Sequence, residues 1–272
     1  MYQSKPIQLY FLQINLINRL SKIKFLRFVF IFFFKKLWIL IKKLDNNQNT
    51  MAFFTQDFLD FFIELAGNNN KDWFDLNRKR YEQSVKIPFQ QFTKHLINYI
   101  AEDDSSFKEL EPKDCIFRIN RDIRFSKDKE PYKLMCSAII SPGGKKSRTI
   151  NGIYFELGPE HVRAYGGVYE LDKNDLEAVR EGIADNLETF KHLYTDQKFK
   201  SLFGEIKGEK NKKLPSHLKD SAEKEALIFN KQFYFFAEFP AEVIIDSNLN
   251  QILINCYQTG RPMSNFLNQF IQ

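Results

Sequence analysis

The sequence has few of the residue types that mark common kinds of site. Its 272 residues include only three cysteines and four histidines. The cysteines form neither a CxxC pair nor a disulfide framework, and the histidines show no HExxH spacing, so no metal site is predicted. The GxxxxGK[ST], GxGxxG and GxSxG motifs are also missing. We therefore expect reduced thiols in a cytoplasmic protein, and the sequence identifies no cofactor.

A long apolar run is missing as well. The uninterrupted run Phe28–Phe34 is seven residues long, whereas a membrane-spanning helix needs about 20. Arg27 and Lys35 flank this run. Membrane binding is therefore not expected except through residues 1–50, where a helix of mixed apolar and basic residues could lie on a membrane surface.

Residues 1–50 differ in composition from the rest of the chain. They contain no Ala or Gly, and 36 of the 50 are Phe, Ile, Leu, Lys, Asn or Tyr, each of which has a codon built only from A and T. An AT-rich upstream region translated in frame, with the true start at Met51, accounts for this composition. We predict a doubtful extension over residues 1–50 and a single domain over residues 51–272.

The charge is also unevenly distributed. The formal net charge is +6, but the first fifty residues carry nine basic residues and one acidic residue. Their net charge of +8 leaves −2 for the remaining residues. The charge balance therefore does not support a generally basic domain that coats nucleic acid.

The spacing of apolar residues predicts an α+β fold. Residues 51–104 show helical spacing, with a helix start or kink at Pro88. From residue 117 the period changes to two, which is typical of strands. Short connections favour an antiparallel meander over about residues 115–169, on which the N-terminal helical part packs. The strands are expected at the following segments: Phe117–Phe125, Leu134–Ile140, Gly152–Leu157 and Val162–Tyr169.

The C-terminal part is predicted to be mainly helical. A helix should follow Leu171 and run to about Phe190, with Asp172 or Asn174 as its N-cap. One further strand is expected at Phe233–Phe239. Two closing helices, Leu249–Tyr257 and Ser264–Phe270, are expected on either side of Gly260 and Pro262.

Four segments together resemble a known family. They read FLDFFIELAGNNNKDWFDLNRKRYE, CIFRINRDIRFSKDKEPYK, SAIISPGGK and YGGVYELD. This combination is similar to a family of uncharacterised conserved proteins, the domain of unknown function 2461. The similarity covers about residues 52–272, and FRINRDIRFSKDKEPYK is its most specific element. The resemblance implies membership of the family and no particular activity.

Basic residues concentrate in one part of this chain. Residues 113–148 contain ten basic and four acidic residues, a local excess of +6. If residues 117–125 form a strand, Arg118, Asn120, Asp122 and Arg124 share one face. Two guanidinium groups then flank an amide and a carboxylate, an arrangement suited to bidentate binding of phosphate or carboxylate.

The basic block, residues 115–133, therefore supplies the candidate anion site. Its candidate ligands are Arg118, Asn120, Arg124, Lys127, Lys129, Tyr132 and Lys133. Asp122 is a weak catalytic candidate, and the possible pocket wall comprises Trp73, Asn77, Tyr81, Glu156 and Arg163.

Three functional hypotheses remain open at this point. The block could bind a small anionic ligand, with or without enzymatic activity on phosphorylated substrates. It could instead be a noncatalytic module that docks an acidic partner or nucleic acid through a broad basic face. A third alternative is an internal network of charges that pair with one another. The oligomeric state is not predicted.

Overall fold

The structure is a computed structural model that describes residues 52–146 and 150–271. The described residues belong to one compact unit, Ala52–Gln272. The predictions for residues 1–50 lie outside the described residues.

Helices make up most of this unit. The α-helices are α3 (Gln56–Gly67), α4 (Lys71–Leu76), α5 (Arg78–Arg80), α6 (Ile87–Asp103), α7 (Pro112–Cys115), α8 (Lys173–Asp185), α9 (Leu187–Thr195), α10 (Gln197–Phe203), α11 (Lys219–Lys224) and α12 (Leu249–Asn268). A π-helical segment, η1 (Tyr81–Lys86), joins α5 to α6. No helix in residues 52–146 and 150–271 is both long and apolar enough to cross a membrane.

Four strands form one antiparallel sheet. They are β1 (Cys136–Ile140), β2 (Ile150–Leu157), β3 (Val162–Val168) and β4 (Phe233–Phe239). The strand order is β1-β2-β3-β4, so each strand pairs with its neighbours in the sequence. The α+β prediction and the antiparallel meander are confirmed.

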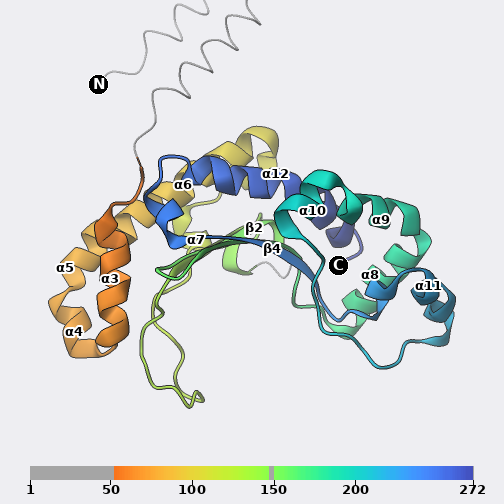
Figure 1. The fold of residues 1–272 in the computed structure, drawn as a ribbon, viewed down its shortest axis with the longest axis horizontal. Coiled ribbons are helices and arrows are strands. Elements are labelled where there is room, and N and C mark those ends of the chain that lie inside the picture. The colour runs from red at the N-terminus through yellow and green to blue at the C-terminus, as the bar shows by residue number, and fades with distance from the viewer. Residues whose placement is uncertain (1–51, 147–149, 272) are drawn as a thin grey trace, which may run out of the picture. The chain divides into compact units, whose positions relative to one another are not determined.

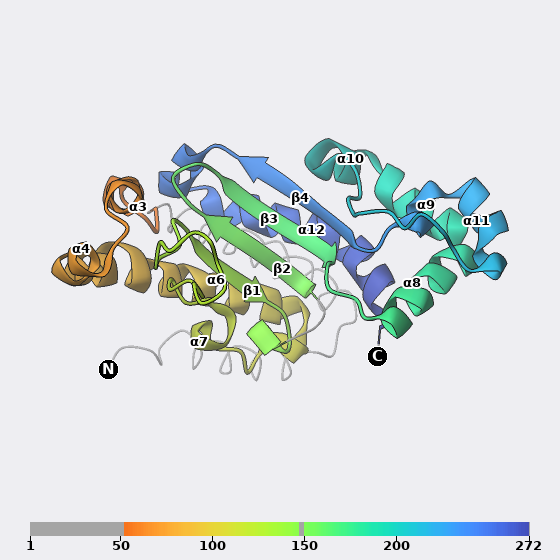
Figure 2. The ribbon, with the colours of Figure 1, turned by 90° about the horizontal axis from the view of Figure 1, so that it is seen from below.

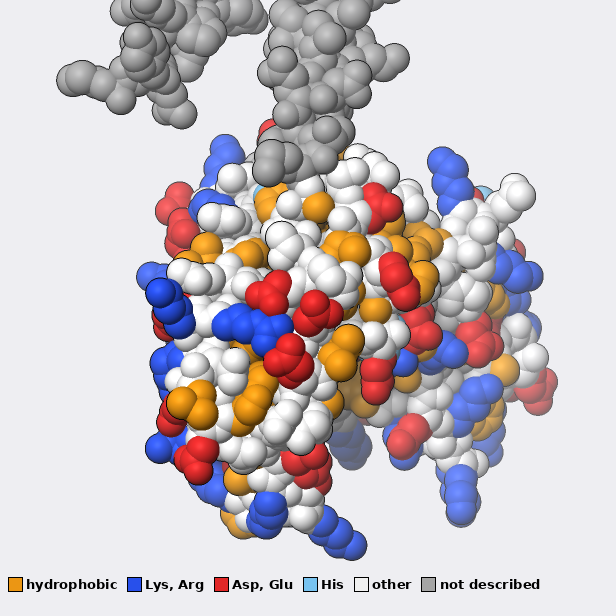
Figure 3. Space-filling model, turned by 60° about the vertical axis from the view of Figure 1, so that its left-hand side comes forward, with side chains coloured by type: hydrophobic (Ala, Val, Ile, Leu, Met, Phe, Trp, Pro, Cys, Tyr) orange, Lys and Arg blue, Asp and Glu red, His pale blue; other side chains and the backbone are white. Residues whose placement is uncertain are grey.

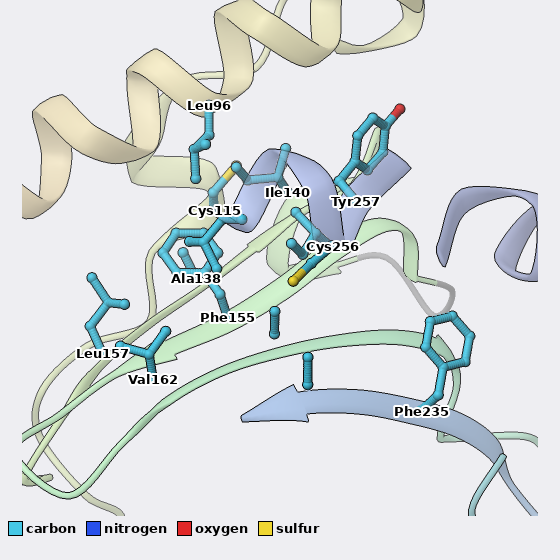
Figure 4. Close-up of a cluster of buried hydrophobic side chains, with 14 of the residues drawn as sticks. Leu96, Cys115, Ala138, Ile140, Phe155, Leu157, Val162, Phe235, Cys256 and Tyr257 are labelled. Atoms are coloured by element: carbon cyan, nitrogen blue, oxygen red, sulfur yellow. The ribbon is translucent and has the colours of Figure 1, made fainter. Parts of the chain in front are cut away.

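One face of this sheet is buried against helices. Figures 1 and 2 show α6 and α12 running along the same face of the sheet. Phe155 of β2 packs against Phe89 and Phe92 of α6, while Phe235 of β4 contacts Phe199 and Phe203 of α10. Figure 4 shows the same core, with Leu96 and Cys256 directed from their helices toward the strands. Strand alternation places the remaining residues on the opposite face.

The N-terminal helices follow from local sequence signals. The Asn70 side chain accepts a hydrogen bond from the backbone N–H of Trp73 and so caps α4. Pro88 lies in the first turn of α6 and has no N–H to donate to the preceding turn. The π-helical segment η1 lies directly before it. The expected irregularity at Pro88 is therefore present as a change of winding within a continuous helical run.

Two helix predictions are wrong in detail. The helix expected from Leu171 to Phe190 is divided at Asn186 into α8 and α9, although Asp172 caps its start as expected. The two closing helices are one helix, α12, which continues through Gly260 and Pro262. A Cβ at Gly260 would lie 2.7 Å from the Phe235 ring, so this glycine permits close packing against the sheet.

Gly167 provides a test of the sheet packing. Its φ of +87° and the 2.2 Å that would separate a Cβ from the Phe233 carbonyl oxygen both exclude a side chain. We expect Gly167→Ala to lower the free energy of unfolding by about 2–4 kcal/mol, because backbone strain adds to overpacking. Gly67→Ala is the control, since a Cβ there meets nothing within 4 Å. Urea unfolding of both variants measures the difference, and equal stabilities would contradict this reading.

Candidate functional site

The basic block forms an arm that projects from the edge of the sheet (Figure 1). The arm, residues 116–135, connects α7 to β1. Its base is held by an isolated bridge between Ile116 and Ala138 and by the Phe117 N–H donating to the Ser137 carbonyl at 3.0 Å. A further bridge, Asn120 to Tyr132, joins the two sides of the arm.

The strand predicted at Phe117–Phe125 is therefore wrong. Only isolated bridges occur there, and backbone pairing ends near Arg121, whose N–H donates to the Pro131 carbonyl at 2.9 Å. The alternation of apolar and polar residues requires a core to bury one face, and the distal arm has none. Phe125 is consequently 95% exposed. The prediction that one face is shared by Arg118, Asn120, Asp122 and Arg124 required a strand, so it has no structural basis here.

Asn69 fastens the arm to the N-terminal helices. Its side-chain amide donates to the Tyr132 carbonyl at 3.0 Å and its side-chain oxygen accepts from the Tyr132 N–H at 3.1 Å. The Tyr132 ring is buried and stacks on Phe74, with the ring centroids 4.0 Å apart. Tyr132 thus has a structural role at the base of the arm. Sequence analysis did not identify Asn69 as a site residue.

Charges in the distal arm pair mainly with one another. Arg124 donates to both oxygens of Asp122, at 2.9 and 2.6 Å, and this guanidinium lowers the pKa of the Asp122 carboxyl. Arg121 lies 2.5 Å from Asp128, and Lys129 donates to the Ile123 carbonyl. Lys127 is exposed. Water screens these exposed pairs, so they contribute little to stability and resemble an ordinary solvated charged loop.

The surface shown in Figure 3, where the left-hand side of Figure 1 comes forward, is not uniformly basic. Lysine and arginine side chains are interspersed with aspartate and glutamate on this face. Such mixing does not favour the broad, uniformly basic face that the docking hypothesis requires.

The base of the arm differs from its distal part. Within the described residues, the side chains of Arg118 and Lys133 have no hydrogen-bond or ion-pair partner. Burial and the neighbouring Arg118 guanidinium lower the pKa of Lys133. The Lys133 ammonium lies 5.5 Å from the centroid of the Phe117 ring. Unlike Arg124, neither cation forms an ion pair within the described residues, although Asp122 attracts Arg118 and Glu156 attracts Lys133 from a longer distance.

A pocket of about 240 Å³ opens at the base of the arm. It lies between η1, the start of α6, the arm and β1, and it is lined by Tyr81, Lys86, Phe89, Gln90, Lys113, Ile116, Phe117, Arg118, Ile119, Met135, Cys136 and Lys145. The lining includes four basic residues and no acidic residue. Its volume is below the about 300–1,000 Å³ of drug-sized ligand sites, which suits a small anion or one end of a larger ligand.

The pocket combines predicted and unpredicted residues. Arg118 and Tyr81 were both predicted site residues, and the structure brings them together here. Lys86, Gln90, Lys113 and Lys145 were not predicted. A signal for two of them was available, because Lys86 and Gln90 are four residues apart in a helical segment and share one face. Lys113 and Lys145 converge only through the tertiary fold, in which the Lys145 ammonium donates to the Lys113 carbonyl at 2.6 Å.

Several predicted wall residues lie elsewhere. Trp73 packs on Phe61, with ring centroids 5.5 Å apart, and the Asn77 side chain donates to the Trp73 carbonyl. Neither residue lines the pocket. Their roles within the N-terminal helices are those of packing and local hydrogen bonding.

Glu156 and Arg163 lie on the face of the sheet opposite α12. Glu156 accepts a hydrogen bond from the Tyr154 hydroxyl at 2.7 Å, and its side chain is only 11% exposed. Arg163 donates to Glu238 at 2.6 Å. Register pairs Glu156 with Arg163 and Arg163 with Glu238, so the three form a row across β2, β3 and β4.

The cysteine thiols are poorly suited to nucleophilic chemistry. Cys115, Cys136 and Cys256 are all buried and unpaired. Burial raises the pKa of Cys115 to about 11 and that of Cys256 to about 12. Thiolates, the reactive form, are therefore scarce at neutral pH.

One side-chain group in the described part of the chain has the spacing of a metal site. Glu177, Glu181 and His217 place one potential ligand atom each within 4.8 Å of the others. The His217 ring already lies 3.0 Å from a Glu181 carboxylate oxygen. Because the group is largely exposed and exposed acidic clusters are common without a metal, the geometry alone does not define a metal site.

The fold and the pocket define an α+β protein with helices on one face of a four-stranded antiparallel sheet and a basic pocket at the sheet's edge. A family model described as Conserved hypothetical protein (DUF2461) matches residues 57–266. The chain belongs to this family. No curated protein and no solved structure matches the chain.

The attachment of the arm can be tested at Asn69. We expect Asn69→Ala to remove about 1 kcal/mol of stability, because two partly buried backbone groups of Tyr132 lose their partners. Hydrogen exchange at the Tyr132 amide and tryptic cleavage after Lys127 or Lys129 should both accelerate. Asn68→Ala is the matched control, since Asn68 bonds only within its own helix end. Equal acceleration in both variants would show that Asn69 does not hold the arm.

Proposed function

We propose that this protein binds a small anion, or the anionic end of a larger ligand, in the pocket at the base of the arm. The observation that carries the proposal is the lining itself, which has four basic side chains and no carboxylate. Arg118 is central because its guanidinium has no ion-pair or hydrogen-bond partner among residues 52–146 and 150–271. A planar guanidinium of this kind suits a phosphate or carboxylate group.

The other polar groups of the pocket support the same ligand chemistry. The Lys86 ammonium lies 4.0 Å from the Glu82 carboxylate, a distance at the outer limit of an ion pair, so Glu82 holds it weakly. Lys113 has no side-chain partner in the described residues. The Tyr81 hydroxyl and Gln90 amide can supply neutral hydrogen bonds. Burial raises the pKa of Tyr81, so this hydroxyl stays protonated and can donate.

No acid–base pair is assigned to this pocket. Asp122, the catalytic candidate from the sequence, is exposed on the arm and bonded to Arg124. We therefore propose binding of an anion and no particular reaction. A phosphorylated small molecule is the ligand class that best fits a compact site with several cations.

Thermal unfolding with inorganic phosphate tests the proposal. At a phosphate concentration ten times Kd, binding to the folded state should add about 1.4 kcal/mol and raise Tm by about 3–6 °C. Arg118→Ala should lose most of this increase. Arg124→Ala is the matched control, because Arg124 lies on the distal arm and is bonded to Asp122.

Ionic strength should be held constant with sodium chloride, since phosphate also stabilises proteins by exclusion from their surface. That general effect is the same in both variants, so the difference between Arg118→Ala and Arg124→Ala isolates the pocket. If the parent protein gains no more than Arg118→Ala, the proposed function fails.

A further inference from the structure

The face of the sheet opposite α6 and α12 carries a row of aromatic rings. In Figure 2 the strands lie in front of these two helices, and no helix of the described part covers the exposed face. Strand alternation places Tyr154, Tyr165 and Phe236 on this face, and register sets them side by side on β2, β3 and β4. Their ring centroids are separated by 5.4 and 5.1 Å.

Further rings extend this row beyond the edge strand β1 and toward the end of β3. Phe117 at the base of the arm lies 6.0 Å from Tyr154 and extends the row beyond β1. Near the end of β3 a second pair, Tyr169 and Tyr234, is separated by 5.2 Å, and Tyr169 is 55% exposed. Four chain segments thus contribute rings to one open surface, which we call the aromatic face. It comprises Phe117, Tyr154, Tyr165, Tyr169, Tyr234 and Phe236.

Cations lie against both ends of this row. The Lys133 ammonium is 5.5 Å from the centroid of Phe117. At the other end, the Arg163 guanidinium and the Lys207 ammonium lie 5.6 and 5.3 Å from the centroid of Phe236. Rings with cations beside them form a surface suited to flat groups joined by an anionic backbone.

The carboxylates of the aromatic face are already engaged. Glu156 accepts from the Tyr154 hydroxyl and is largely enclosed. Glu238 is held by Arg163 at 2.6 Å. Their repulsion of an anionic ligand is therefore reduced. Lys133 forms no ion pair in the described chain, although Glu156 attracts its ammonium, and Lys207 pairs with Glu205 at 3.5 Å on the exposed surface.

We propose that the aromatic face binds single-stranded nucleic acid, with bases stacked on Phe117, Tyr154, Tyr165 and Phe236 and phosphates near Lys133 and Lys207. A duplex buries the faces of its bases in its own stack, so the same rings cannot contact them. Phe117 lines the anion pocket as well, but Tyr154, Tyr165 and Phe236 do not. The proposal therefore does not depend on an anion bound in that pocket.

Fluorescence anisotropy with a labelled oligothymidylate tests this proposal. A probe of about 20 nucleotides exceeds the 4–16 nucleotides that single-strand-binding domains usually cover. Phe236→Ala should weaken binding about 5- to 150-fold, because the loss of one stacking ring has an effect of that size. Phe236→Tyr, which keeps the ring, should bind as the parent does. Tyr99→Ala on α6 is the control for removal of a half-buried ring elsewhere.

The full chain also carries the basic residues 1–50, which attract single strands and duplexes alike, so affinity for one probe is not a sufficient test. Because the rings stack only on bases that are not already in a duplex, the parent should prefer the single strand over a duplex of the same length. Phe236→Ala should lose that preference. Lys86→Ala, which changes the anion pocket from η1, should leave it unchanged, so failure of the anion pocket is distinguishable from failure of this proposal.

Circular dichroism should verify that each variant is folded. If Phe236→Ala does not fold, Lys133→Ala replaces it, and its slope of log affinity against log salt should be shallower by about 0.7. Equal affinity for single strand and duplex in the parent would overturn the proposal. Unchanged binding in a folded Phe236→Ala, or an unchanged salt slope in Lys133→Ala, would also overturn it.

Discussion

Burial of one face of the sheet against α6, α10 and α12 is the constraint on which the rest of the structure depends. Apolar surface withdrawn from water is the main favourable term in folding, and here it is concentrated on alternate residues of four strands. Phe155 and Phe235 supply large rings to this layer and are fully buried. Because alternation is strict within a strand, the same packing fixes which residues face away from the helices.

The two edges of the sheet are both partly protected, and the arm is one of the protecting segments. An unpaired edge strand invites pairing with another chain. The Phe117 N–H bonds to the carbonyl of Ser137 along β1, while Lys207 forms a bridge with Tyr234 along β4. The base of the arm therefore has a structural reason to be where it is. That position also brings Arg118 beside η1 and Lys133 beside the open face.

The sequence predicted elements well where a local signal and a core face agreed. The predicted strand Phe233–Phe239 coincides with β4, because its alternation corresponds to a real buried face. The same alternation failed at Phe117–Phe125, where nothing covers Phe125. Pro262 and Gly260 were read as a break, yet α12 continues because packing against the sheet outweighs their low helix propensity.

The site was less predictable because its parts meet only through the tertiary fold. Arg118 was identified from its charge and position, but its neighbours Lys86 and Lys145 lie about thirty residues before and after it in the sequence. Asn69 had no distinguishing signal, since one asparagine in a run of three caps α4 while another holds the arm. The spacing of residues in the sequence does not predict that the Asn69 side chain forms hydrogen bonds with the distant Tyr132 backbone.

The charge excess of the basic block is thus divided into two physical regimes. In the distal arm, Arg121 and Arg124 have carboxylate partners in solvent, where little free energy depends on an added anion. At the base, Lys133 is half-buried and Arg118 is close enough to lower its pKa. Like charges in a partly desolvated place repel each other, and a bound anion removes that repulsion. The base of the arm is therefore where the proposed anion would relieve the most repulsion.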